Sequence, residues 1–151
     1  MVELALVLPL LLVLMLGMVD FGKAFKAWID ETHLANEGAR LAAVQYAVAG
    51  CSGNPNVCLA NYIQQGADFG EIKAGSQSLD KAKVCISYPT NPATTTSGLV
   101  GDPVEVTVQS KYHWLDYLVN KKVTALVTPF AGTATMRLEQ NPSDKTGGCS
   151  T

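Results

Sequence analysis

An apolar run near the start of the chain limits what it can fold into more than any other feature. Residues 4–19, LALVLPLLLVLMLGMV, contain no charged side chain. As a helix these 16 residues would rise roughly 24 Å, a little less than the ~30 Å hydrocarbon core of a bilayer. A chain of 151 residues, one ordinary domain, cannot bury such a helix by itself. The run therefore requires cover from lipid or from other helices.

The run does not have the pattern of a cleavable signal peptide. No Lys or Arg precedes it, no small-x-small cleavage site follows it, and its pattern continues into a second helical segment. The missing basic leader indicates that a short leader has already been removed ahead of this N-terminus.

The helical pattern continues beyond the apolar run with a different character. Phe21, Phe25 and Trp28 recur at helical spacing, and charged residues fall mostly on other faces. We therefore predict one continuous helix to about Ala49, with a hydrophobic membrane or filament-core segment over 1–20 and an amphipathic distal half over 21–49. The three aromatic side chains are expected to take part in helix packing rather than in ligand binding.

The rest of the chain, within residues 21–151, predicts an α+β domain. Asn54-Pro55 is typical of a helix start, and a short helix is expected over about 55–68. Over about 83–139 apolar and polar residues alternate, as in KVCISY and VEVTVQSKY, which predicts β-strands. One face of each strand would be exposed to solvent, and this is typical of antiparallel pairing. The dry face needs a cover, and the distal half of the long helix is the obvious candidate. The predicted fold is one long N-terminal helix packed by its distal half on a small antiparallel sheet, followed by a C-terminal tail.

The four cysteines, which permit three complete pairings, are Cys51, Cys58, Cys85 and Cys149. A metal site is disfavoured because no Cys-x-x-Cys occurs, and buried free thiols are the remaining alternative to disulfides. Cys51 and Cys58 bracket a turn-rich octet that closes easily. If the protein is exported and oxidised, the favoured pairing is Cys51–Cys58 with Cys85–Cys149, which would hold the Gly-rich tail.

The sequence carries no recognisable active site. It has no Gly-x-Ser-x-Gly, no His-Glu-x-x-His and no phosphate-binding glycine loop. His33 in the long helix and His113 beside Trp114 are expected to be structural, and neither a metal nor a cofactor is expected. The net charge of -2, without a basic stripe, gives no basis for nucleic-acid binding. The loop PTNPATTTSGLVGDP is expected to be exposed, and it is a candidate for O-linked sugar.

Two residues do not suit a simple membrane anchor, namely Glu3 at the front of the run and Pro9 inside it. An ionised acid deep in hydrocarbon costs on the order of 3 kcal/mol, so it is retained where it finds a partner. The free α-amino group of an identical neighbour is such a partner if the helices bundle with an axial stagger. Pro9 removes an intrahelical hydrogen bond and gives the helix a place to bend or extend. The alternative is a plain anchor whose Glu3 lies among the lipid headgroups.

These residues resemble a known family. VELALVLPLLLVLMLGMVDFGKAF is similar to the N-terminus of TadE-like pilins and pseudopilins of the tight-adherence (Tad) pilus system. EGARLAA at 37–43 and TATMRLE at 133–139 are similar to two further patches of that family. The resemblance implies a type IV pilin-like fold, no enzymatic activity, and cleavage by a prepilin peptidase several residues ahead of Glu3. Because only two residues precede Glu3 here, we expect the mature start just upstream of Met1, or a different processing.

The sequence thus predicts a structural subunit of an extracellular pilus-like filament, held in the cytoplasmic membrane before assembly. Its expected partners are copies of itself, the pilus assembly machinery and the prepilin peptidase. One alternative is a minor pseudopilin that primes or caps assembly, and another is an adhesin whose Thr-rich loop contacts surfaces. A membrane-tethered enzyme comes last, for want of a site.

Overall fold

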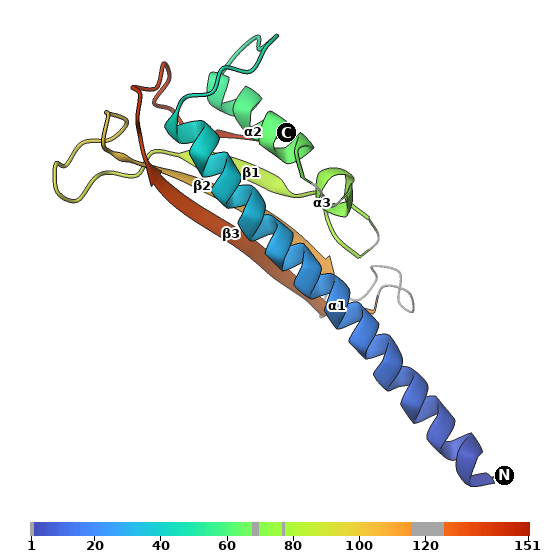
Figure 1. Ribbon diagram of the computed structural model, residues 1–151. Coiled ribbons are helices and arrows are strands. Elements are labelled where there is room, and N and C mark those ends of the chain that lie inside the picture. Colours follow the sequence, from blue (N-terminus) through green and yellow to red (C-terminus); the bar gives the residue numbers. More distant parts are fainter. Residues whose placement is uncertain (1, 68–69, 77, 116–125) are drawn as a thin grey trace.

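A long helix projects from a small α+β domain (Figure 1). The computed structural model describes residues 2–67, 70–76, 78–115 and 126–151, apart from the side chains of Val2, Glu3, Ala5 and Glu71. The helices are α1 (Val2–Ala43), α2 (Pro55–Gln65) and α3 (Gly70–Ala74), and the strands are β1 (Lys83–Ser87), β2 (Pro103–His113), β3 (Val127–Arg137) and β4 (Gly148–Cys149). The predicted fold class, a long N-terminal helix on a small antiparallel sheet, is confirmed.

The four strands form one antiparallel sheet in the order β3-β2-β1-β4. β2 and β3 pair along their full lengths, from Pro103 opposite Arg137 to His113 opposite Val127. Burial alternates along β1 and β2, as the period of two predicted. The buried members are Val84 and Ile86 in β1, and Val104, Val106, Val108, Ser110 and Tyr112 in β2. The C-terminal part of the region predicted as strands, about 83–139, forms a single strand, β3, and the two-residue strand β4 had no signal in the sequence.

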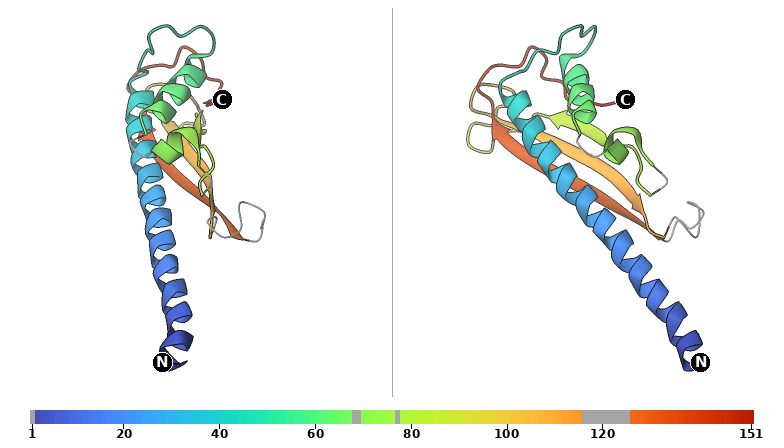
Figure 2. Two further views of the ribbon diagram at one scale, coloured as in Figure 1. Left: turned by 90° about the vertical axis from the view of Figure 1, so that its right-hand side faces the viewer. Right: turned by 45° about the vertical axis from the view of Figure 1, so that its right-hand side comes forward.

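Two helices cover the buried face of this sheet, with the distal half of α1 along β2 and β3 and α2 along β1 and β4 (Figures 1 and 2). The face that α1 turns to the sheet consists largely of fully buried alanines, namely Ala24, Ala27, Ala35, Ala39 and Ala42. Small side chains let the backbones approach closely. At Gly132 of β3, an added Cβ would lie only 2.7 Å from the carbonyl oxygen of Glu31 on α1. The helix and the strand are therefore in direct backbone contact at this point.

α1 ends at Ala43, earlier than the predicted end near Ala49. Gln45 adopts a left-handed backbone with φ of 51°. Its N–H donates to the Ala42 carbonyl at 3.1 Å, and the next N–H, of Tyr46, donates to the Leu41 carbonyl at 3.0 Å. This hydrogen-bond pattern terminates helices. The predicted end near Ala49 was wrong because a non-glycine residue, Gln45, takes the left-handed position that ends the helix.

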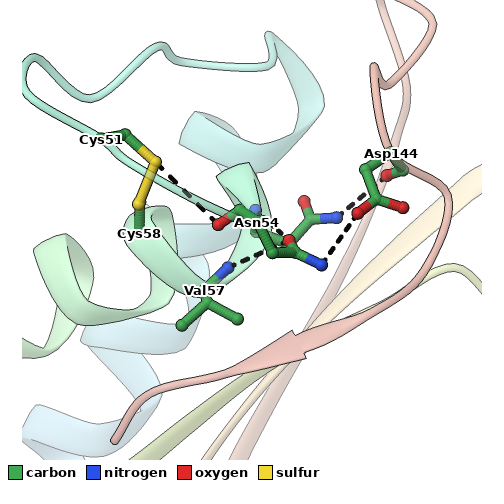
Figure 3. Close-up of a disulfide and its surroundings, with 6 residues drawn as sticks. Cys51, Asn54, Val57, Cys58 and Asp144 are labelled. Carbon is green, nitrogen blue, oxygen red and sulfur yellow. Dashed lines mark hydrogen bonds between the residues drawn. A yellow bond between two sulfur atoms is a disulfide. The ribbon is translucent and has the colours of Figure 1, made fainter.

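The loop after α1 is closed by the Cys51–Cys58 disulfide (Figure 3). Asn54 caps α2, as the Asn54-Pro55 pair predicted. The Oδ1 of Asn54 accepts the N–H of Asn56 at 2.8 Å, and Pro55 occupies the first turn. The helix ends at Gln65, with Gly66 as its C-cap. The last residues of the predicted helix include 68, which lies outside the described part of the chain.

The second disulfide, Cys85–Cys149, joins β1 to β4 and fixes the C-terminal tail. The structure therefore contains both pairs that the sequence favoured, with no free cysteine. Side-chain amides from the start of α2 also hold the tail. Asn54 Nδ2 donates to Asp144 Oδ2 at 2.8 Å (Figure 3), and Asn56 Nδ2 donates to the Thr146 carbonyl at 2.8 Å.

A carboxyl group is buried in the seam between α1 and the sheet. Glu31 is completely buried, well beyond the apolar run that ends at Val19. Its Oε1 accepts a hydrogen bond from the Ser110 hydroxyl of β2, and its Oε2 has no hydrogen-bond partner among the described residues. Burial raises the pKa of Glu31 from 4.5 to about 7; the Ser110 hydrogen bond opposes this shift and the nearby Asp30 adds to it. The neutral acid is thus the form that suits the seam.

We predict that Glu31→Gln removes a pH dependence of stability. Between pH 4.5 and about 7 the folded chain keeps a proton on Glu31 that the unfolded chain has lost. The stability that neutral Glu31 contributes is fully present below the lower pKa and is lost as the pH rises through the higher one. The loss amounts to about 3 kcal/mol. Denaturant unfolding in detergent across this range, compared with the exposed Glu37→Gln as control, measures it. Parallel stability curves for the parent and Glu31→Gln would contradict the prediction.

Candidate assembly and membrane surface

The first half of α1 has no cover from the rest of the chain. Every described side chain between Leu4 and Val19 is exposed, and the large apolar ones keep between 48% and 76% of their surface accessible. Among the described residues, one helix is long and apolar enough to cross a membrane, and 6% of its most apolar window is buried. The segment projects away from the domain in every view (Figures 1 and 2).

The two residues that the sequence singled out for assembly both lie in this uncovered half. Glu3 belongs to the first turn of α1, and its side chain is outside the described part of the structure. α1 continues through Pro9, whose side chain is exposed. The roles predicted for both residues stay predictions.

The uncovered half ends sharply at Asp20. This side chain is only 2% exposed. The Tyr112 hydroxyl donates to its Oδ1 at 2.7 Å and lies 3.1 Å from its carbonyl oxygen, and the Leu115 N–H donates to its Oδ2 at 2.9 Å. We call these three residues the Asp20 clamp. It joins α1 to the far end of β2.

Asp20 is the last residue of the hydrophobic segment predicted over 1–20, and its side chain is buried against the domain. A signal for this was present. Asp20, Ala24, Ala27 and Glu31 follow the helical spacing i, i+4, i+7 and i+11, and all four are buried. An acid on the same helix face as the buried alanines marks the start of the buried stripe, the face of α1 that begins with these four residues.

The aromatic residues of the helix, for which helix packing was predicted, are exposed on α1. Phe21, Phe25 and Trp28 are 63%, 51% and 45% exposed. Their rings contact one another along the helix, with centroids 6.5 Å apart for Phe21–Phe25 and 5.8 Å apart for Phe25–Trp28. Alanines take the sheet-facing positions because large rings would hold the helix away from β2 and β3. The three aromatics form an exposed stripe on the flank of α1.

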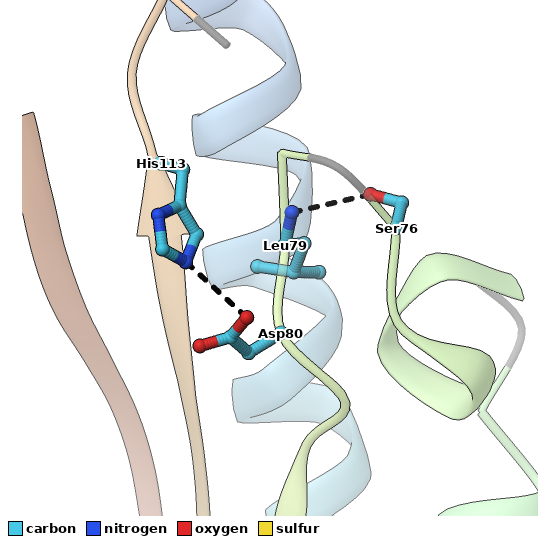
Figure 4. Close-up of polar contacts among 4 residues, drawn as sticks. All are labelled: Ser76, Leu79, Asp80 and His113. Carbon is cyan, nitrogen blue, oxygen red and sulfur yellow. Dashed lines mark hydrogen bonds and ion pairs between the residues drawn. The ribbon is translucent and has the colours of Figure 1, made fainter. Parts of the chain in front are cut away.

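Of the two histidines, His113 has a side-chain partner and His33 is exposed. His113 Nε2 lies 3.2 Å from Asp80 Oδ1 (Figure 4), and beside it the backbone of Leu79 bridges to Tyr112. His33 is exposed on α1. Within the described ranges, no group of three or more His, Cys, Asp or Glu side chains is placed to hold a metal ion.

The Thr-rich loop between β1 and β2 is folded around one buried carboxylate, Asp102. Its Oδ1 accepts hydrogen bonds from Asn91 Nδ2 at 3.0 Å and from the hydroxyls of Thr96 at 3.0 Å and Thr94 at 3.3 Å. Its Oδ2 accepts the Leu99 N–H at 3.1 Å. Burial by itself would raise the pKa of Asp102, but these donors outweigh it and hold the pKa below its ordinary value. The loop is exposed, as expected, but it has a defined shape.

We predict that Tyr112→Phe loosens the junction at Asp20. The substitution keeps the ring and removes the hydroxyl, so the buried carboxylate keeps only the Leu115 N–H among the partners described above. A hydrogen bond to a charged group contributes about 1.5–3 kcal/mol, and denaturant unfolding should show a loss of that size. Tyr62→Phe, at an exposed tyrosine of α2, is the control and should change stability little. Equal effects of the two substitutions would show that the clamp adds nothing.

Comparison with known proteins finds a match for the N-terminal helix. The family model described as TadE-like protein matches residues 1–40, which hold the uncovered run, the Asp20 clamp position and most of the buried stripe. No curated protein and no solved structure matches the chain. The resemblance predicted from the sequence is confirmed over this segment: the N-terminal helix of the chain is similar to TadE-like proteins.

Proposed function

We propose that the chain is a structural subunit of an extracellular pilus-like filament that is held in the cytoplasmic membrane before assembly. The observation that carries this proposal is the uncovered half of α1, an apolar helix that extends out of a domain with its own core. Lipid covers this helix in the membrane stage. In the filament, the same segments of neighbouring copies cover one another, and their lateral burial drives polymerisation.

The α+β domain would form the outer surface of such a filament. Its core is complete without the first half of α1, and two disulfides hold the α1–α2 loop and the C-terminal tail. Disulfides of this kind suit an oxidising, extracellular location. The domain in this division runs from Asp20 to Thr151, and the filament-core segment ends at Val19.

The exposed aromatic stripe is a second surface on which the helices of neighbouring copies can pack. Phe25 and Trp28 lie beyond the length of helix that a bilayer covers, because α1 from Val2 to Trp28 rises about 40 Å against ~30 Å of hydrocarbon. These rings are therefore available to a neighbouring copy after assembly. This is where we expect the packing role that the sequence assigned to Phe21, Phe25 and Trp28.

Glu3 would set the register between copies. In a staggered bundle it meets the terminal amine of the next copy among apolar side chains, where losing one partner of a buried pair costs about 3–5 kcal/mol. Processing by a prepilin peptidase would generate that amine, and the pilus assembly machinery would move the subunit out of the membrane. Pro9, in the same segment, would let the helix bend or extend as it packs.

The experiment that tests this function counts filaments per cell for three substitutions. Glu3→Ala and Glu3→Gln should leave the domain folded and the chain in the membrane but sharply reduce filament number, since the neighbour's amine is then left unpaired. Glu3→Asp keeps the charge on a shorter arm and should be intermediate. Glu105→Ala, on the outward side of β2, is the control and should assemble like the parent.

The outcomes distinguish a structural subunit from a simple membrane anchor and from a minor pseudopilin. A simple membrane anchor predicts normal filament numbers for all four variants, which would end the assembly role of Glu3. A minor pseudopilin predicts that the chain is found at filament ends only, so immunogold labelling along the whole fibre supports the structural subunit and labelling at tips alone contradicts it.

A further inference from the structure

The end of the domain that carries the Asp20 clamp also carries a cluster of apolar side chains. Phe21 stacks on Trp114 with ring centroids 6.4 Å apart, and Trp114 contacts Tyr112 edge-on at 5.1 Å. The backbone N–H of Trp114 donates to the carbonyl of Leu126 at 2.9 Å, which brings a further exposed apolar side chain to the same place. We call Phe21, Trp114 and Leu126 the apolar collar.

Trp114 is held in a fixed orientation within this collar. Its ring N–H donates to the Thr128 hydroxyl at 2.7 Å, so its polar group is satisfied by the domain while part of the ring stays accessible. Phe21 is the most exposed ring of the collar, at 63%. The collar therefore presents aromatic surface outward without leaving a buried donor unsatisfied.

The position of the collar agrees with the thickness of a bilayer. The uncovered helix from Val2 to Val19 rises about 27 Å, close to the ~30 Å hydrocarbon core. Asp20 is the first residue that the domain covers, and a buried acid hydrogen-bonded to Tyr112 and Leu115 cannot enter hydrocarbon without breaking the clamp. The domain thus stops further insertion at the depth where the hydrocarbon ends. Aromatic side chains are enriched at that level in membrane proteins.

From this geometry we propose that the collar is a membrane-contact surface. Before assembly, the clamp end of the domain rests on the bilayer, with Phe21 and Trp114 in the headgroup region and the Asp20 clamp as the depth stop. The partner is the lipid surface itself. The inference rests on the membrane stage of the proposed function and adds the depth and the orientation of the domain.

The chain contains two tryptophans, which makes the depth measurable. Trp28→Phe leaves Trp114 as the fluorophore, and Trp114→Phe leaves Trp28, which α1 places about 12 Å beyond Asp20. The full chain is reconstituted in phosphatidylcholine vesicles that carry a nitroxide on the headgroup, bromine near the carbonyl end of the acyl chains, or bromine near their methyl end. Quenching of the tryptophan emission then reports how close each ring lies to each depth.

We expect Trp114 to be quenched most by the headgroup nitroxide and the shallow bromine, and least by the deep bromine. Quenching of Trp28 by the same lipids should be weaker by about twofold or more, because lipid-attached quenchers act at short range and the helix carries this ring further from the surface. Phe21→Trp in a chain without either native tryptophan repeats the test at an exposed position where folding is not at risk. It should give the pattern of Trp114.

Four results would overturn the inference. If Trp114 and a tryptophan at position 21 are quenched no more than Trp28, the collar does not touch lipid, although the membrane stage stands. If the deep bromine quenches them best, the clamp is not a depth stop. Shielding of Trp114 that grows with the protein-to-lipid ratio would assign the collar to a second copy instead. A chain that does not enter the vesicles at all contradicts the membrane stage itself, and the contact falls with it.

Discussion

The sheet is too short to cover the helix that packs on it, and the rest of the structure follows from this mismatch. α1 has 42 residues and rises about 63 Å, whereas the 11 residues of β2 and β3 extend about 36 Å. Close to half of α1 must therefore project beyond the sheet. The composition of the helix matches this division, with alanines where the sheet lies against it and large aliphatic side chains where nothing does. The covered half builds the domain, and the uncovered half obliges the chain to find lipid or neighbours.

The boundary between the two halves is defined by polar contacts rather than by a gradual change in hydrophobicity. Asp20 is the residue nearest the N-terminus at which the domain holds the helix by hydrogen bonds, from Tyr112 and Leu115 at the end of β2. Deeper in the seam, Gly132 and Glu31 bring the strand and helix backbones together. A helix held at two such points transmits any force on its uncovered half directly to the domain. This rigidity would suit the proposed function, in which the subunit leaves a membrane and is then held by its helix in a polymer.

Much of the fold could be predicted from the sequence because its signals are local. The uncharged run, the period of two along β1 and β2 and the Asn54-Pro55 start of α2 each point to one structure, and the cysteine spacing favoured the pairing that forms. The end of α1 could not be predicted, since Gln45 takes a left-handed conformation that sequence rules reserve for glycine. The exposure of the aromatic rings could not be predicted either, because hydrophobicity identifies an apolar face but not whether alanine or phenylalanine faces the sheet. The Asp20 clamp depends on a tyrosine 92 residues away along the chain, and local patterns carry no information at that distance.

The measurement that tests the division of the helix most directly compares two truncated chains. One begins at Asp20 and keeps the clamp; the other begins at Gly22 and lacks it. If the sheet and the distal half of α1 form a complete core, the first fragment should be soluble, monomeric in sedimentation and rich in helix and strand by circular dichroism. The second should unfold at a lower denaturant concentration because Tyr112 has lost its carboxylate partner. A fragment from Asp20 that is unfolded or aggregated would show that the domain needs the uncovered half of α1, and would contradict the division.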